Sequence, residues 1–200
     1  MNKEIKKIGI FGGTFNPPHI AHSIIAMQVK DLLNLDKIIF IPSGNHPFKD
    51  SISPGFRLAM AEIAFSENEY FEVSDIEIRK TSGKTYTVDT LEDLKIMYKD
   101  SLTEFYLIIG SDNLIDLPKW KDPDRLFELS KIVVISRPGF MPVDDGIKYL
   151  DKVIIPPIPL LEISSTVIRK YVYENKPVKY LVHPGVEKFI SEKNLYKQTK

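Results

Sequence analysis

The sequence predicts an α/β fold in which a doubly wound, Rossmann-like parallel sheet carries helices on both faces. Apolar runs of strand length recur at 7–11, 37–41, 104–109, 131–136 and 152–155. Helical patterns separate most of these runs. Buried strands that alternate with helices indicate a parallel sheet with right-handed crossovers. Ligands of such sheets bind beyond the carboxyl ends of the strands, so we expect the functional site there.

Composition indicates an ordinary globular protein. The chain has 200 residues, 43% of them hydrophobic and 27% charged, which suits one domain of about 100–200 residues. We expect a single domain over residues 1–200, with helices from about 164 to 200 packed on the sheet. The net charge is zero, which argues against nucleic acid as a partner.

The chain shows no apolar run of membrane length, and we expect no secretory leader. Its sequence begins with a charged segment that leads into the first strand. It contains no cysteine, which excludes disulfides and cysteine chemistry. We therefore expect a cytoplasmic protein without membrane contact.

The first strand leads into a glycine turn, Gly12-Gly13-Thr14-Phe15-Asn16-Pro17-Pro18. The two glycines allow a sharp turn and a close approach to a ligand. The prolines suit the first turn of a helix, so we expect a helix from near Pro18 to Leu33. Its free N–H groups and positive dipole end would face the turn, which makes this a predicted phosphate site.

His19 and His22 lie three residues apart, on one face of the predicted helix. Their ring N–H groups can donate hydrogen bonds to phosphate oxygens. A zinc pair is a weaker reading, because zinc needs about three or four ligands and His46 and His183 are not at ligand spacing. It also stays open that one of the two rings, more readily that of His22, packs in the core and contacts no ligand.

Further along, several segments carry polar residues that can have either a structural or a ligand-binding role. Lys49 ends a loop after the second strand and is a surface lysine or a phosphate ligand. Thr87 or Asp89 is a candidate cap for a helix over 88–98. Asp112, after the strand 104–109, is either a helix cap or a ligand for a ribose or a metal.

Trp120 lies in a polar Pro-Lys-Trp-Lys segment and is either a core residue or a stacking surface for a flat ring. Arg137 follows the strand 131–136 and is either a charge near the ligand or an exposed residue. Gly83-Lys84-Thr85 looks like the end of a phosphate-binding loop, but the required glycine at position 78 is Ile78. We also expect helices over 123–129 and 184–193.

A second motif, Ile163-Ser164-Ser165-Thr166-Val167-Ile168-Arg169, begins the predicted helix 164–173. Ser164 is a good N-cap residue, and Ser165 and Arg169 share a face. Hydroxyls, a helix N-terminus and an arginine together suit a polyphosphate. A plain capped helix with a surface arginine explains the same residues about equally well.

These motifs carry a resemblance to a known family. His19-Ile20-Ala21-His22 resembles the H-x-G-H signature of the nucleotidyltransferase superfamily, with alanine in place of glycine. The string I-S-S-T-x-x-R at 163–169 matches the second signature of that superfamily. The fuller string G-G-T-F-N-P-P-H at 12–19, together with the segments around Tyr86 and Trp120, is similar to bacterial nicotinate-nucleotide adenylyltransferases. The resemblance extends from Gly9 to about His183.

The resemblance implies a role for each matching residue. The implied catalytic residues are His19, His22 and Arg169. ATP and its phosphates would contact Gly12, Gly13, Thr14, Phe15, Lys49, Gly110, Asp112, Ile163, Ser164, Ser165 and Thr166. The nicotinate nucleotide would contact Asn16, Tyr86, Thr87, Trp120 and Arg137, with backbone N–H groups near Tyr86 meeting the carboxylate and Trp120 stacking on the ring. The family loop usually reads P-P-H-K, whereas this chain has His46-Pro47-Phe48-Lys49.

The implied reaction is adenylyl transfer from ATP to nicotinate mononucleotide, giving nicotinate adenine dinucleotide and pyrophosphate. Mg²⁺ would enter with ATP, held by phosphates and water and by no protein side chain. The alternatives are the same chemistry on nicotinamide mononucleotide, phosphopantetheine or a flavin nucleotide, and a non-catalytic nucleotide-binding module. An RNA-binding domain is disfavoured by the zero net charge. A homo-oligomer is open.

Overall fold

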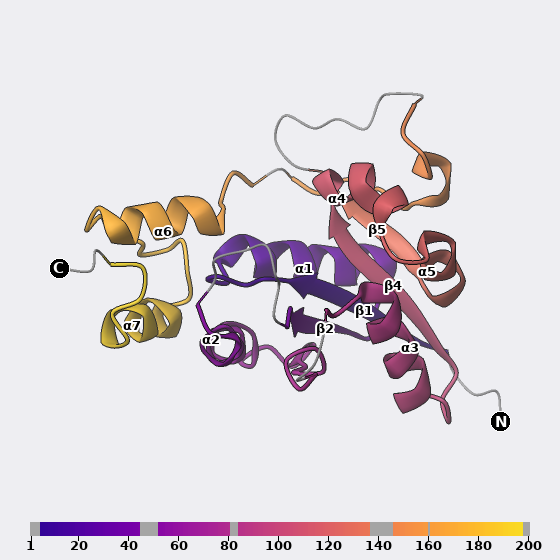
Figure 1. Ribbon diagram of the computed structural model, residues 1–200, viewed down its shortest axis with the longest axis horizontal. Coiled ribbons are helices and arrows are strands. Elements are labelled where there is room, and N and C mark those ends of the chain that lie inside the picture. Colours follow the sequence, from indigo (N-terminus) through magenta and orange to yellow (C-terminus); the bar gives the residue numbers. More distant parts are fainter. Residues whose placement is uncertain (1–4, 45–51, 81–83, 137–145, 160, 198–200) are drawn as a thin grey trace.

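A computed structural model describes residues 5–44, 52–80, 84–136, 146–159 and 161–197. Its centre is a sheet of five strands in the order β3-β2-β1-β4-β5, and every pair of neighbours is parallel (Figure 1). The strands are β1 (Lys6–Gly13), β2 (Lys37–Pro42), β3 (Phe71–Val73), β4 (Thr103–Gly110) and β5 (Lys131–Ile135). This architecture confirms the predicted doubly wound fold.

The strand order reverses at β1, which lies between β2 and β4. Gly13 pairs with Pro42 at one side of β1, and Phe11 pairs with Ile108 at the other. The glycine turn therefore leaves the sheet at its topological switch point, where ligands of this fold class bind.

Helices and short 3₁₀ turns connect the strands. They are α1 (Ile20–Leu33), α2 (Pro54–Phe65), α3 (Thr87–Met97), α4 (Ser111–Asp116), η1 (Leu117–Lys119), α5 (Pro123–Leu129), η2 (Leu150–Lys152), α6 (Ser165–Tyr173) and α7 (Pro184–Glu192). None of the helices in these residues is long and apolar enough to cross a membrane.

Alternating side chains of the strands build two cores, one on each face of the sheet. On one face Ile10, Ile39 and Leu107 pack with residues of α3 and α5. On the other face Phe40 and Ile108 pack with residues of α1 and α2. Successive side chains of a strand point to opposite faces of the sheet, and here both faces are buried. Each strand is therefore a continuous apolar run in the sequence.

The C-terminal helices α6 and α7 form a third cluster with α2. Met60 of α2 is buried among residues of both helices, including Ile168 and Val186. Figure 1 shows α6 and α7 at the end of the molecule opposite the N terminus, next to α2. These helices therefore reach the sheet through α2, whereas the sequence analysis expected them to pack on the sheet itself.

One expected element differs and two elements were not anticipated. The expected strand 152–155 is an isolated bridge between Ile154 and Val133, preceded by the turn η2. The prolines at 156 and 157 cannot donate to a ladder, which prevents its extension. The sequence analysis missed β3, which has only three residues, and α2, which begins with Pro-Gly.

Three helix starts also differ from expectation. α1 begins at Ile20 with His19 as its N-cap, two residues later than expected. The N-cap residue of α3 is Tyr86, so neither Thr87 nor Asp89 caps it. The N-cap of α4 is Gly110, and Asp112 lies in the first turn instead. In contrast, Ser164 caps α6 as predicted, with its side chain accepting from the Val167 N–H group.

Candidate active site

The glycine turn at the end of β1 presents open backbone at Gly12. A Cβ atom added there would meet no atom within 4 Å, whereas one at Gly13 would lie 3.0 Å from the ring of Phe15. Phe15 adopts a φ of 48°, in the left-handed region, and its ring is buried. The side chain of Phe15 is thus a core residue that holds the turn, and only its backbone is available to a ligand.

His19 and His22 stack at the start of α1. Their ring centroids lie 3.7 Å apart, and Nδ1 of His22 accepts a hydrogen bond from the His19 backbone N–H at 3.1 Å. A ring nitrogen that accepts carries no proton, so the ring proton of His22 lies on Nε2, where it can donate to a ligand. Phe15 packs edge-on against His22 at 5.0 Å and fixes its orientation.

The N-terminus of α1 is less free than the sequence analysis expected. The Ile20 N–H group donates to the Leu181 carbonyl at 2.9 Å, and the His22 N–H group donates to the His19 carbonyl. These two donors are used within the protein. The anion-binding capacity of this turn therefore depends more on the histidine rings than on the helix N–H groups.

The second motif is joined directly to the first. Nη1 of Arg169 donates to the Asn16 carbonyl at 2.8 Å, and Oγ of Ser165 donates to the Pro17 carbonyl at 2.7 Å. The start of α6 is thereby fixed against the turn that carries the two histidines. A guanidinium carries five N–H donors, so Arg169 can hold the turn and still contact a phosphate.

The neighbouring residues of the second motif have different surroundings. Thr166 accepts from Nη2 of Arg169 at 3.3 Å and is exposed. Ser164 is occupied by its cap hydrogen bond with Val167. Ile163 is half-buried against the C-terminal cluster, so its side chain is structural.

Asn16 is buried in the turn and bonded to the C-terminal segment. Its Oδ1 accepts from the Tyr196 hydroxyl at 2.7 Å. Burial raises the pKa of Tyr196, which keeps the hydroxyl protonated as a donor. Sequence reasoning missed Tyr196, because no local pattern connects it with a residue 180 positions earlier.

Arg57 of α2 was also missed, although it is 1% exposed. Its Nη1 donates to the Thr14 carbonyl at 3.0 Å and to Oγ of Ser43 at 3.3 Å, and its Nη2 donates to the Gly44 carbonyl at 3.0 Å. Burial lowers the pKa of this guanidinium. The available signal was an arginine in helical register with Met60 and Ala61, which are buried on the same face.

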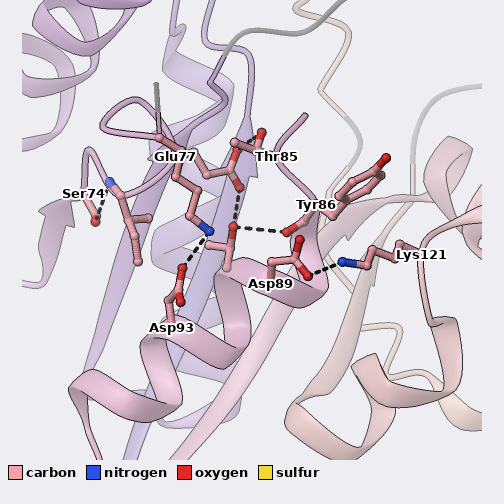
Figure 2. A network of polar contacts seen from close by, with 10 residues as sticks. Ser74, Glu77, Thr85, Tyr86, Asp89, Asp93 and Lys121 are labelled. Carbon is pink, nitrogen blue, oxygen red and sulfur yellow. Dashed lines mark hydrogen bonds and ion pairs between the residues drawn. The ribbon is translucent and has the colours of Figure 1, made fainter. Parts of the chain in front are cut away.

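Glu77 connects the loop after β2 with the start of α3, and Figure 2 shows its contacts on the α3 side. Its Oε2 accepts from the Gly44 N–H group at 3.4 Å and from Thr85 at 3.2 Å, and its Oε1 accepts from Thr90 at 3.0 Å. The Thr90 hydroxyl oxygen also lies 3.3 Å from the Tyr86 carbonyl oxygen, so its single proton is shared between these two acceptors. The N-terminus of α3, where the resemblance places the pyridine nucleotide, is therefore held to the edge of the sheet that carries the glycine turn.

Three of the residues expected near the pyridine nucleotide, Tyr86, Thr87 and Trp120, lie around this same helix start. Tyr86 is 40% exposed, and Nζ of Lys121 lies 5.0 Å from its ring centroid. Lys121 also pairs with Asp89 of α3 at 2.6 Å, as seen in Figure 2, and this hydrogen bond raises the pKa of Lys121. The pair ties the segment of Trp120 to the start of α3. Trp120 itself is half-buried against the core on that face.

Two of the remaining predicted residues lie at the end of β4. Gly110 ends β4, next to the switch point, and Asp112 is exposed in the first turn of α4. Lys49 and Arg137 lie outside the described residues.

Within the described ranges, no group of three or more His, Asp or Glu side chains is placed to hold a metal ion. A divalent ion that arrives with its nucleotide and keeps phosphate and water oxygens as ligands, as expected from the sequence, stays a prediction.

The fold and the two joined motifs define a cytidylyltransferase-like protein, and the family model of that description matches residues 10–171. A relative from Caldicellulosiruptor saccharolyticus is 38% identical over 96% of this chain and 100% of its own length. One from Desulfitobacterium hafniense is 39% identical over 98% of this chain and 99% of its own. Both are named "Probable nicotinate-nucleotide adenylyltransferase". The chain belongs to the nicotinate-nucleotide adenylyltransferase family.

Solved structures agree with this assignment. Plasmodium falciparum nicotinic acid mononucleotide adenylyltransferase complexed with NaAD has a TM-score of 0.81 and 26% identity, covering 96% of this chain and 97% of that one. The same enzyme complexed with APC has a TM-score of 0.78 and 25% identity over the same shares. The similarity therefore covers the strands, the glycine turn and the C-terminal helices together.

Proposed function

We propose that this protein transfers the adenylyl group of ATP to nicotinate mononucleotide and thereby makes nicotinate adenine dinucleotide for NAD biosynthesis. Relatives at close to 40% identity over nearly the whole chain carry the name of this activity. The P. falciparum structure of similar fold is described as a complex with NaAD. The same chemistry on nicotinamide mononucleotide is not favoured by these relatives.

One structural observation supports the proposal above the others. The two motifs meet at the switch point of the sheet. The contact of Ser165 with Pro17 joins residues 148 positions apart in the sequence, and the contact of Arg169 with Asn16 joins residues 153 positions apart. Ser165 and Arg169 hold the turn that presents His19 and His22. A site that brings two imidazoles, an arginine and glycine backbone together is suited to a polyphosphate.

The reaction needs little covalent help from the protein. An oxygen of the nicotinate mononucleotide phosphate attacks the α-phosphorus of ATP and forms the new P–O bond. The bond from that phosphorus to the bridging oxygen breaks, and pyrophosphate leaves with its electron pair. The attacking phosphate is ionised near neutral pH, because its second pKa is about 6, so no protein base is required.

Catalysis then consists of bringing two anions into line and offsetting the charge that develops. We assign this work to His22 and His19, with Arg169 contributing positive charge at the same turn. The Nε2–H group of His22 would donate to a phosphate oxygen of ATP. Gly12, with open space in place of a side chain, would let the phosphates approach the backbone.

The acceptor would bind at the start of α3. Its carboxylate would meet backbone N–H groups near Tyr86 and Thr87, where a helix N-terminus favours an anion. Trp120, held close by the pair of Lys121 and Asp89, would stack on the nicotinate ring. We assign Mg²⁺ to the substrate, as the complex with ATP. The single domain and the cytoplasmic location expected from the sequence stay predictions, and a homo-oligomer stays open.

Product analysis tests the proposal. The purified chain is incubated with ATP, Mg²⁺ and nicotinate mononucleotide, and pyrophosphate and the dinucleotide are quantified separately. We expect the two products in equal amounts and neither when nicotinate mononucleotide is omitted. Pyrophosphate release without the dinucleotide, or no reaction of ATP at all, would contradict the assigned activity.

A further inference from the structure

We propose that Arg57 and Glu77 are positioning residues that clamp the Gly44 peptide from both sides and so couple the ATP half of the site to the acceptor half. This inference rests on the proposed function for the identity of the two halves. Neither side chain touches the reacting atoms in the scheme above. Both act through one peptide group at the carboxyl end of β2.

The arm toward ATP is the guanidinium of Arg57. It donates to the Thr14 carbonyl, within the glycine turn, and to the Gly44 carbonyl, each at 3.0 Å. A buried cation is costly, and well-packed apolar residues in place of buried ions often leave stability unchanged or improved. Stability alone therefore does not account for an arginine that is 1% exposed here. Its geometric effect is to fix the distance between two loops.

The arm toward the acceptor is the carboxylate of Glu77. One oxygen accepts from the Gly44 N–H group and from Thr85, and the other accepts from Thr90, which is 2% exposed. Thr85 directly precedes Tyr86, and the Thr90 hydroxyl oxygen lies 3.3 Å from the Tyr86 carbonyl oxygen. The carboxylate thus fixes the start of α3 on both sides of Tyr86 (Figure 2).

Glycine is the only residue type that fits at position 44, between the side chains of Arg57 and Glu77. A Cβ atom there would lie 2.6 Å from the Glu77 backbone carbonyl oxygen. Its own carbonyl accepts from Arg57 while its N–H group donates to Glu77. A continuous series of hydrogen bonds therefore runs from Thr14 through this peptide to Thr90.

The first test replaces the carboxylate by an amide. In Glu77→Gln the side chain keeps its size but loses its charge and has one acceptor oxygen in place of two. If that oxygen faces the Gly44 N–H group and Thr85, the NH2 group faces the Thr90 hydroxyl, which must then accept and turn its own proton to the Tyr86 carbonyl. We expect the KM for nicotinate mononucleotide to rise about 10-fold, as loss of a charged hydrogen bond can produce, with the thermal midpoint nearly unchanged. Glu192→Gln, an exposed glutamate on α7, is the matched control and should resemble the wild type.

Two further variants separate the arms. Thr90→Val is isosteric and loosens only the acceptor arm, so it should raise the KM for nicotinate mononucleotide more than the KM for ATP. Arg57→Met fills the same space without the guanidinium and should raise both KM values and lower kcat. Because both arms act through Gly44, the double variant Arg57→Met/Glu77→Gln should be no worse than the more impaired single variant.

The outcomes distinguish the clamp from the proposed function. The clamp would be overturned if the kinetic loss of the double variant equalled the product of the losses in the two single variants. It would also be overturned if Glu77→Gln had the KM values of an active wild type. A wild type that forms no dinucleotide would instead overturn the proposed function. In that event, amide hydrogen exchange at Gly44 still tests the clamp: we expect about 10-fold faster exchange in Glu77→Gln, and equal rates would overturn it.

Discussion

At the scale of single residues, the ring of His22 is held by an uncommon combination of contacts. It stacks on His19, packs against Phe15 and accepts a backbone hydrogen bond through Nδ1. We expect His22→Ala to lower kcat by about 100-fold or more, because one donor to a developing charge can be worth that much. His183→Ala, which removes the cap of α7, should cost stability but leave kcat unchanged. Turnover of His22→Ala near that of the wild type would remove the residue from the mechanism.

Trp120 gives a second prediction at this scale. Stacking of a base on an aromatic side chain is worth about 1–3 kcal/mol, so Trp120→Ala should raise the KM for nicotinate mononucleotide by about 10-fold. The KM for ATP should change little. Trp120→Phe keeps a ring at the position and should recover part of the loss. Equal KM values in wild type and Trp120→Ala would mean that the half-buried indole serves only the core.

The sequence identified residues whose partners lie nearby in the chain and missed those whose partners do not. Ser164 was predicted as a cap from three-residue spacing, and the structure confirms it. Arg57 and Glu77 gave no comparable signal, because the backbone of Thr14 and Gly44 comes near them only after the sheet has formed. Thr87 and Asp89 were wrong as caps, since the N-cap of α3 is Tyr86, one residue before Thr87 and three before Asp89.

At the scale of elements, the proposed function depends on the joint between α6 and the glycine turn, made by the hydrogen bonds of Ser165 and Arg169. Ser165→Ala removes the hydrogen bond to the Pro17 carbonyl and leaves α6 capped. Such a bond contributes about 1 kcal/mol, so we expect kcat/KM for ATP to fall about 5-fold. Ser191→Ala, on an exposed position of α7, is the matched control. A value equal to that of the control would show that the joint does not position the histidines.

The elements themselves were predictable where their pattern was strong. The runs of β1, β2, β4 and β5 are apolar on both faces, which marks buried parallel strands. The three-residue strand β3 has too few residues for a period, and the expected strand at 152–155 contributes a single bridge. In both cases pairing with an existing neighbour, rather than local sequence, decides the structure.

At the scale of the whole molecule, Tyr196 connects the C-terminal segment with the first loop. Its hydroxyl donates to Asn16, and burial raises the pKa of Tyr196 despite the nearby guanidiniums of Arg169 and Arg57. The neutral phenol is therefore the form that the folded state favours. An unfolded tyrosine ionises near pH 10, so this contribution is complete below about pH 10 and is lost as the pH rises further.

We therefore expect Tyr196→Phe to be less stable than the wild type by about 1 kcal/mol at neutral pH. The difference should narrow above about pH 10, because only the wild type loses stability through this group. Denaturant unfolding at several pH values measures it, with Tyr180→Phe, a change at a residue that is 81% exposed, as control. A difference that stays constant up to strongly alkaline pH would contradict the assigned direction of the pKa shift.

The fold class and the position of the site were predictable at this scale, because strand–helix alternation and a glycine turn after the first strand together specify both. The packing of α6 and α7 on α2 could not be predicted. The apolar faces of these two helices indicate that another element covers them, but not which element it is. The family resemblance supplied the substrates, which no periodicity or spacing in the chain could indicate.

The central claim is adenylyl transfer to an acceptor that carries a carboxylate on its pyridine ring. The most direct test is kcat/KM with nicotinate mononucleotide and with nicotinamide mononucleotide, measured in parallel with saturating ATP and Mg²⁺. The account predicts a strong preference for the acid, since backbone N–H groups at the start of α3 would meet its charge. Equal values, or a preference for the amide, would contradict that arrangement and the substrate assigned to this protein.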